Sequence, residues 1–392
     1  MALPAAAHDV SYVSMARLLM LLLAMLPLGV SALAQEPKGC GAPAAINDGW
    51  ALATPAEAGF DGARLCNLDG LLEQWPQRNI HAVVVARRGK LVMERYFTGS
   101  DERWGQQLGD VKYAPDMLHD LRSISKSTVS LLVGIALGDG KFPPLDSPVF
   151  DAFPAFASLA TPEKRRITFR QLLTMSSGFA WDETIPYSNP ANSERRLIAS
   201  TDPVRYVLEQ PLVTPPGTVY NYNGGNTALL AAAIAKANGT YIHDYAREKL
   251  FAPLDISQSE WVSMPASGEI AAASGLRLRP RDSAKLGQIL LADGQWNGRQ
   301  VIPKGWAAEA VKPRLNGAGI YYYGYQWWLG RSWLADREID WIAGVGYGGQ
   351  RLFIVPSLDL VVMINAGHYR DGLQSIIPHA ILNQVVLPAV KD

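Results

Sequence analysis

The chain has 392 residues, and its 36 lysines and arginines balance its 36 aspartates and glutamates, so the formal net charge is zero. This balance argues against a nucleic-acid-binding protein, which needs a basic surface. The six histidines are scattered without a metal-binding motif, so we expect no metal and no cofactor.

The first 34 residues have the pattern of an export signal. Arg17 precedes an apolar run over 18–28, and Ala32 and Ala34 form an Ala-x-Ala cleavage site. The run is too short for a comfortable transmembrane span. We therefore predict cleavage after Ala34, export to the periplasm or the medium, and no stable membrane span in the mature protein. Met1 and Met15 remain alternative starts of translation.

The two cysteines, Cys40 and Cys66, both follow the predicted signal closely. In an oxidising compartment such a pair favours a disulfide over two free thiols. A bridge closing a loop of this length stabilises a protein by roughly 3 kcal/mol in the chain-entropy model.

The next elements in chain order are a helix over 61–75 and two strands over 80–97, joined by a turn at Arg87–Lys90. This hairpin belongs at the edge of a sheet. Residues 98–120 are polar and show no clear element. A helix then begins near Ser123 and ends at 138–140, where Gly, Asp and Gly follow one another.

Ser123 and Lys126 are the strongest catalytic candidates. On a helix, a separation of three places both side chains on one face, about 5–6 Å apart at Cβ. A serine hydroxyl becomes a nucleophile when a base removes its proton, and a lysine can act as that base if burial depresses its pKa towards neutrality. The positive end of the helix would stabilise an oxyanion formed beside Ser123.

The Ser-x-x-Lys spacing alone is weak evidence, because roughly one such pair is expected by chance in a chain of this length. The alternative is a serine that caps the helix, followed by a solvated lysine in the first turn. Further signals are needed to choose between the two interpretations.

Residues 150–270 are mostly helical in pattern, with helices after Thr168, over 202–209 and over 228–236. A loop with Trp181, Asp182, Glu183 and Tyr187 suits either the rim of a cleft or a plain surface loop. Tyr220 and Tyr222 lie among three asparagines before the third helix. A tyrosine there can relay a proton, although the segment is also typical of a turn.

The C-terminal third returns to strands, predicted over 324–330, 350–356 and 358–365, with a glycine-rich stretch over 341–349 and a last helix over 372–386. Strands at both ends predict an α+β fold, with an antiparallel sheet from the N- and C-terminal segments and an inserted helical lobe. We expect one domain over 35–392, with the α/β lobe at about 50–140 and 270–392 and the helical lobe at about 141–269.

Three segments occur in the order typical of one superfamily: Ser123-Ile-Ser-Lys126, Tyr220–Thr227 and the glycine-rich 341–349. The chain resembles the serine β-lactamase and penicillin-binding protein superfamily, above all its class C β-lactamase-related hydrolases, which include esterases and 6-aminohexanoate-dimer hydrolases. Typical phrases of this group are also present at 167–178, 215–218, 273–278 and 296–298. The likeness covers roughly 50–390 and implies the β-lactamase/transpeptidase-like fold.

The resemblance implies that Ser123 is the acylated nucleophile, Lys126 its general base or proton relay, and Tyr222 the tyrosine of the second motif. Tyr220 remains the alternative. Where the family has an asparagine two residues after the tyrosine, this chain has Gly224, which leaves Asn223 and Asn226 as other amide sources.

The third family motif, a lysine or histidine on a strand that binds a substrate carboxylate, is absent from 341–349. The loss of both this cation and the asparagine argues against efficient β-lactam hydrolysis and towards an esterase or amidase. We expect the oxyanion hole to combine the Ser123 amide with one amide near 346–350.

The predicted function is therefore that of a serine hydrolase that cleaves a small-molecule ester, amide or peptide-like substrate through an acyl-enzyme on Ser123, with no nucleic-acid partner. One alternative is a β-lactamase or D-alanyl-D-alanine peptidase acting on cell-wall substrates, whose carboxylate anchor would be Arg277, Arg279 or Arg351. Another is a non-catalytic penicillin-recognising sensor. The sequence does not indicate an oligomeric state.

Overall fold

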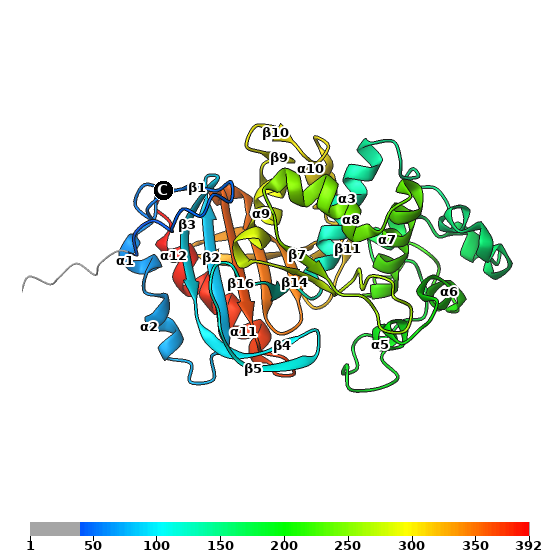
Figure 1. Cartoon of the computed structure of the whole chain (residues 1–392), viewed down its shortest axis with the longest axis horizontal. Coiled ribbons are helices and arrows are strands. Elements are labelled where there is room, and N and C mark those ends of the chain that lie inside the picture. The colour runs from blue at the N-terminus through cyan, green and yellow to red at the C-terminus, as the bar shows by residue number, and fades with distance from the viewer. Residues whose placement is uncertain (1–39, 392) are drawn as a thin grey trace, which may run out of the picture. The chain divides into compact units, whose positions relative to one another are not determined.

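Nine strands form one sheet in the order β1-β3-β2-β16-β15-β14-β13-β12-β11 (Figure 1). The computed structural model describes residues 40–391, so the predicted export signal lies outside the described residues. Neighbouring strands of this sheet are antiparallel except β1 and β3. The strands span Ala51–Leu52 (β1), Ile80–Arg87 (β2), Lys90–Tyr96 (β3), Leu315–Asn316 (β11), Tyr322–Tyr323 (β12), Trp328–Leu334 (β13), Arg337–Gly346 (β14), Gln350–Val355 (β15) and Leu360–Ala366 (β16).

The sheet confirms the predicted α+β fold, because its strands come from the two ends of the chain. The predicted hairpin over 80–97 is β2 and β3, and the predicted strands over 350–356 and 358–365 are β15 and β16. The parallel pairing of β1 was not predicted, since a strand of two residues has no periodicity to detect.

The side chains of the central strands point alternately to the two faces of the sheet, so the buried core is divided between those faces. In β2, Val84 and Ala86 join one buried cluster, whereas Val83 and Val85 join the other. This follows from the period of two in a strand, which sends successive side chains to opposite faces. One face packs against α9 (Pro280–Leu291) and α3 (Ile124–Gly138), and the other against α11 (Leu373–Ala380) and the π-helical turn η7 (Ile381–Val386).

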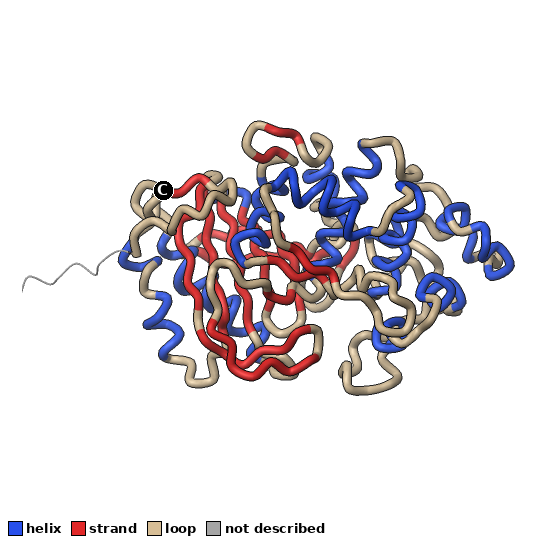
Figure 2. Tube along the Cα trace, viewed as in Figure 1, coloured by secondary structure: helices blue, strands red, loops and turns tan. Residues whose placement is uncertain are grey.

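The helices between the two sets of strands gather together away from the sheet, where Figure 2 shows few strands. They are α4 (Phe169–Leu173), α5 (Ser193–Ile198), α6 (Pro203–Glu209), α7 (Gly224–Asn238) and α8 (Ile242–Ala246). Helix α3 contacts α7 on one side and β14 and β15 on the other. The predicted helix near Ser123 therefore lies between the sheet and the other helices. Separately, no helix within residues 40–391 is long and apolar enough to cross a bilayer.

Two predicted segments need correction. Residues 98–120 contain the ribbon of β4 (Thr98–Arg103) and β5 (Gln106–Lys112) and the short β6 (His119–Asp120). The strand predicted over 324–330 is confirmed only from Trp328 onward, where β13 begins, because Gln326 has a left-handed φ of 63° and breaks the extended run before it. Much of the glycine-rich stretch is instead the strand β14, which ends at a tight turn through Gly348 and Gly349.

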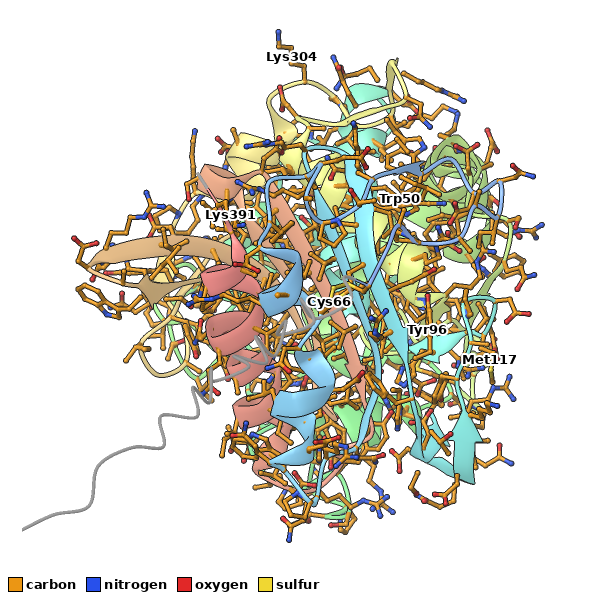
Figure 3. All side chains as sticks on the ribbon, turned by 90° about the vertical axis from the view of Figure 1, so that its left-hand side faces the viewer. Trp50, Cys66, Tyr96, Met117, Lys304 and Lys391 are labelled. Atoms are coloured by element: carbon orange, nitrogen blue, oxygen red, sulfur yellow. A yellow bond between two sulfur atoms is a disulfide. The ribbon has the colours of Figure 1, made fainter. Side chains whose placement is uncertain are left out.

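A disulfide joins Cys40 to Cys66, with the two Cα atoms 5.4 Å apart. The predicted bridge is therefore confirmed. Cys66 lies between α1 (Gly62–Leu65) and α2 (Leu68–Glu73), the two parts of the predicted helix over 61–75. These helices pack beside η7 and α12 (Leu387–Ala389), and Figure 3 shows Cys66 at this meeting of the first and last helices.

Candidate active site

Ser123 occupies the junction between strand β6 and helix α3. It is the residue just before the helix, yet its side chain makes no capping hydrogen bond. The preceding Arg122 has a φ of 49°, a left-handed conformation that is uncommon outside glycine. Because the helix does not use it, the Ser123 hydroxyl is available to a neighbouring group.

Lys126 lies one helical turn further along and points back to Ser123. Its Nζ donates hydrogen bonds to Ser123 Oγ at 3.1 Å and to the carbonyl oxygen of Ala273 at 3.2 Å. Only 1% of Lys126 is exposed. The alternative of a capping serine and a solvated lysine is therefore wrong. Ala273, whose backbone carbonyl holds the lysine, is the first residue of the family-like segment 273–278.

Tyr222 completes a group of three residues that we call the serine cluster: Ser123, Lys126 and Tyr222. The Nζ of Lys126 lies 4.7 Å from the centre of the Tyr222 ring, and the Ser123 hydroxyl is close enough to Tyr222 to act against the rise in the pKa of the tyrosine. Tyr220 instead packs its ring on Tyr323 at 5.1 Å, and its buried hydroxyl has no hydrogen-bond partner within residues 40–391. The structure thus brings Tyr222, and not Tyr220, to Ser123.

The charges around Lys126 overturn one expectation. Burial by itself lowers the pKa of Lys126, but the oxygen of Tyr222 and the nearby Glu194 and Glu183 raise it above the usual value for lysine. Burial also raises the pKa of Tyr222, although Lys126 opposes this. The resting state is therefore a lysine ammonium beside a neutral tyrosine, and not the neutral lysine base expected from burial alone.

Glu183 also reaches the serine cluster, from the loop that the sequence offered as the rim of a cleft or as a plain surface loop. Its Oε1 accepts hydrogen bonds from Trp181 Nε1 at 2.6 Å and from the backbone N–H of Gly224 at 2.5 Å. Its Oε2 is buried without a partner within residues 40–391. Burial and the neighbouring Glu194 raise the pKa of Glu183 to about 7, despite the opposing effect of Lys126. The loop over 181–187 therefore sends one carboxyl group into the site.

Gly224 shows why this carboxyl group has room. A Cβ atom at position 224 would lie 2.9 Å from Glu183 Oε1 and 3.5 Å from the carboxyl carbon of Glu194. A side chain at position 224, where the family has an asparagine, would therefore collide with the carboxyl group of Glu183. In the sequence, the sign of this arrangement is Gly224 itself. It stands where the family has an asparagine side chain, so another residue has to fill that space.

Asn223 and Asn226 do not replace that asparagine. Asn223 Oδ1 accepts the backbone N–H of Asn226 at 3.1 Å and so caps helix α7. The Nδ2 of Asn226 faces the sulfur of Met175 at 3.8 Å. Within the described residues, neither side chain makes a hydrogen bond to Ser123 or Lys126. Both serve the helix start and its packing.

The strand that would carry the third family motif is β14. At its end, a Cβ atom on Gly346 would lie 2.3 Å from the carbonyl oxygen of Leu121 and 3.2 Å from the Cβ of Arg122. Only glycine allows this approach, so the end of β14 packs directly against the segment that leads into Ser123. This places the amides after Gly346 beside the nucleophile segment.

Of the three arginines considered as carboxylate anchors, Arg277 and Arg279 pair with carboxylates, whereas Arg351 contacts only neutral oxygens and its Nε has no hydrogen-bond partner within residues 40–391. Arg277 pairs with Asp120 at 2.7 Å and Glu260 at 2.7 Å, and Arg279 pairs with Asp282 at 2.5 Å. The buried Arg351 donates to the carbonyl oxygens of Gly346 and Gln350 and to the hydroxyl of Ser375.

Within residues 40–391, the structure gathers one set of three side chains with the separations of metal ligands: His81, Asp101 and His119. We call this set the histidine cluster. The sequence shows no metal motif because the three residues stand 20 and 18 positions apart and meet only through the strands β2, β4 and β6.

Comparison with known proteins agrees with this geometry. The family model "Beta-lactamase" matches residues 68–371. The 6-aminohexanoate-dimer hydrolase of Paenarthrobacter ureafaciens is 25% identical over 337 residues, covering 79% of each chain. A penicillin binding protein from Bacillus halodurans has a TM-score of 0.62 at 16% identity, covering 80% of this chain and 99% of that one.

A class C beta-lactamase mutant has a TM-score of 0.60 at 17% identity, covering 81% of this chain and 96% of that one. At such identities the two solved structures show a shared fold, whereas the family model spans most of the chain. The chain therefore belongs to the beta-lactamase family.

Proposed function

We propose that this beta-lactamase-family hydrolase cleaves an ester or amide bond through an acyl-enzyme on Ser123. The observation that carries the proposal is the hydrogen bond of 3.1 Å between the buried Lys126 ammonium and Ser123 Oγ, with the Tyr222 ring centre 4.7 Å from the same ammonium. Nucleophile, proton relay and charge stabiliser are the three parts that serine acyl transfer requires.

The reactive form is the serine cluster that has lost one proton. Tyr222 as a phenolate accepts the Ser123 proton while Oγ forms a bond to the substrate carbonyl carbon, and the Lys126 ammonium stabilises both negative oxygens. The bond to the leaving alcohol or amine then breaks, and Tyr222 returns the proton to it. Water attacks the acyl-enzyme by the reverse proton path and releases the acid.

The oxyanion hole in this proposal uses two backbone amides. The Ser123 N–H has no hydrogen-bond acceptor within residues 40–391. In the turn after β14, Gly348 N–H donates to Gln374 Oε1, whereas Tyr347 N–H has no acceptor in the described chain. Tyr347 directly follows Gly346, which packs on Leu121. We therefore assign the second amide to Tyr347.

The preferred substrates are esters and amides without a carboxylate beside the scissile bond. Arg277 and Arg279 already pair with carboxylates, Arg351 is buried and held by backbone carbonyl oxygens, and Glu183 would repel an anion close to Lys126. This argues against the β-lactamase and peptidase alternatives, whose substrates carry a carboxylate. The resemblance to a 6-aminohexanoate-dimer hydrolase adds that dimer to the substrates worth testing.

The test measures hydrolysis of p-nitrophenyl butyrate, nitrocefin and the 6-aminohexanoate dimer by the mature protein and its Ser123→Ala variant. We expect the ester or the amide to be cleaved, nitrocefin to be nearly inert, and the variant to be inactive. Preferred turnover of nitrocefin would favour the β-lactamase alternative. Labelling of Ser123 by a fluorophosphonate without any turnover would favour the sensor, and full activity of Ser123→Ala would refute the assignment.

A further inference from the structure

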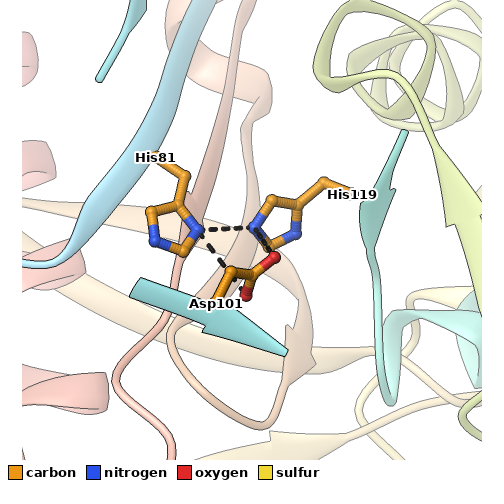
Figure 4. Close-up of side chains that lie close together, drawn as sticks. All are labelled: His81, Asp101 and His119. Atoms are coloured by element: carbon orange, nitrogen blue, oxygen red, sulfur yellow. Dashed lines mark hydrogen bonds and ion pairs between the residues drawn. The ribbon is translucent and has the colours of Figure 1, made fainter. Parts of the chain in front are cut away.

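The histidine cluster lies fully inside the protein, at the meeting of three strands. His81 comes from β2, Asp101 from β4 and His119 from β6, and none is more than 2% exposed. His81 Nδ1 and His119 Nε2 face each other at 2.8 Å (Figure 4). Asp101 Oδ1 lies 3.8 Å from His81 Nδ1, and Asp101 Oδ2 lies 3.7 Å from His119 Nε2.

Each ring has an inner nitrogen, which faces the other ring, and an outer nitrogen, which points away from it. The hydrogen bonds of the outer nitrogens determine where the ring protons are. His81 Nε2 is 3.1 Å from Asn79 Oδ1, and the amide of Asn79 is oriented by its Nδ2, which donates to the carbonyl oxygen of Ser100 at 2.7 Å. His119 Nδ1 is 2.9 Å from the carbonyl oxygen of Asp120. Both outer partners are oxygens that only accept, so both outer nitrogens carry the proton.

The inner nitrogens of the two rings are then the positions left to bind a cation. His81 Nδ1 and His119 Nε2 would repel each other at 2.8 Å unless a positive centre lies between them. Asp101 adds a buried negative charge and, among residues 40–391, forms ion pairs with these two histidines and with no lysine or arginine. A buried carboxylate without a cation is costly, so the cluster lacks one positive charge.

The surroundings of Asp101 match the outer shell of a metal site. Tyr113 and Tyr369 donate their hydroxyls to the two oxygens of Asp101, the second at 3.1 Å. The Tyr113 ring stacks on His81 with the ring centres 4.8 Å apart. Groups that fix the tautomer of a histidine and orient a carboxylate are the usual second shell of metal ligands.

We propose that His81, Asp101 and His119 bind one divalent transition-metal ion, with Zn²⁺ as the expected metal. Two imidazole nitrogens and the two carboxylate oxygens supply four donors of the kind that zinc prefers, and too few oxygens for calcium or magnesium. Two ligands at zinc distances lie roughly 3.3 Å apart, so the rings need to separate by about 0.5 Å on binding.

The role of this ion is structural. All donors are buried and no open position faces solvent, which is the pattern of a closed structural site. The ion would tie β6 to β2 and β4, and β6 leads through Arg122 directly into Ser123. The site would thus hold in place the segment that presents the nucleophile without taking part in the reaction. Because the donors are enclosed, the ion would enter during folding.

The first experiment measures metal content by mass spectrometry in the mature protein, produced in zinc-supplemented medium and purified without chelators. We expect about one equivalent of zinc in the wild type. His119→Gln should lose it, whereas His243→Gln, a matched change outside the cluster, should retain it. A wild type that is folded, active and free of stoichiometric metal would overturn the proposal and indicate a proton shared between the two rings.

The second experiment covers the case in which His119→Gln does not fold. Unfolded wild-type protein is refolded with Zn²⁺, with Co²⁺ or with a strong chelator. We expect Zn²⁺ at about 100 times its Kd to raise the Tm by roughly 5 °C over the chelated sample, and Co²⁺ to show the visible absorption of a four-coordinate site. Equal Tm values in all three samples, with no Co²⁺ absorption, would refute the site.

Discussion

The serine cluster and the histidine cluster are both buried and polar, and only three residues separate His119 from Ser123 along the chain. They differ in where their protons lie and in which groups can accept them. In the serine cluster, Ser123, Lys126 and Tyr222 each carry a proton that a neighbour can accept. In the histidine cluster, the ring protons are held by outside oxygens and the inner lone pairs converge. Similar burial therefore suits one cluster to proton transfer and the other to holding a cation.

The largest expected effect is the loss of activity in Ser123→Ala, which should leave thermal stability almost unchanged. Ser123→Ala should lower kcat/KM by at least about 10³-fold, because no other nucleophile lies in the serine cluster. Its Tm should stay within about 2 °C of the wild type, since the hydroxyl caps no helix. Steady-state kinetics and thermal unfolding check both values. A large drop in Tm with residual activity would show that Ser123 serves the fold.

The next effect distinguishes the two tyrosines. Tyr222→Phe should lower kcat by about 10²- to 10³-fold, because it removes the proton relay to Ser123. Tyr220→Phe is the matched control and should change kcat less than about 2-fold, since its hydroxyl has no partner within residues 40–391. The reverse order of the two effects would transfer the relay to Tyr220.

A smaller effect concerns pH. The deprotonated serine cluster is the reactive form, so kcat/KM should rise with pH, and the raised pKa values of Lys126 and Tyr222 place that rise in the alkaline range. Glu183 contributes to both raised values. Glu183→Gln should therefore lower these pKa values and move the rise to lower pH by about one unit.

The control for this pH profile is Asp182→Asn, which changes an exposed carboxylate that accepts hydrogen bonds from the neighbouring Thr184. Its profile should match that of the wild type. If Glu183→Gln also leaves the rise in place, Glu183 does not influence the protons of the serine cluster.

The smallest effect tests whether the two clusters are coupled. Tyr369→Phe removes the hydroxyl that donates to Asp101 Oδ1 but keeps the ring over Arg122. We expect the free energy of unfolding to fall by about 1–2 kcal/mol, with kcat/KM within about 2-fold of the wild type. Urea unfolding and ester kinetics provide the two readouts. A loss of activity without a loss of stability would link the clusters through Arg122.

Local patterns made the serine cluster predictable. Ser123 and Lys126 share one helical turn, and Tyr222 stands at the start of a strongly apolar helix, so both motifs are visible in short segments. The hairpin of β2 and β3 was predictable for the same reason, since the turn at Arg87–Lys90 separates two apolar runs. The sheet as a whole followed from strands at the two ends of the chain.

Features that depend on distant contacts were not predictable. The role of Glu183 depends on the space left by Gly224, which lies 41 positions away along the chain. The ribbon of β4 and β5 has mostly exposed residues, so it lacks the apolar alternation that reveals a strand. The protonation of Lys126 depends on Glu183 and Glu194, two acidic groups that the fold alone brings close.

The central strand β2 has as its neighbour β16, the last strand of the chain, and the backbone N–H of Asp61 donates to Ala389 near the C-terminus. A ribosome must therefore translate as far as β16 before β2 can find that partner. Such long-range pairing is slow and leaves apolar strands exposed while the chain is nascent. A premature stop that removed β16 would thus leave β2 and β3 without their link to β15 and β14, the strands that support the nucleophile helix, although every motif residue had been translated.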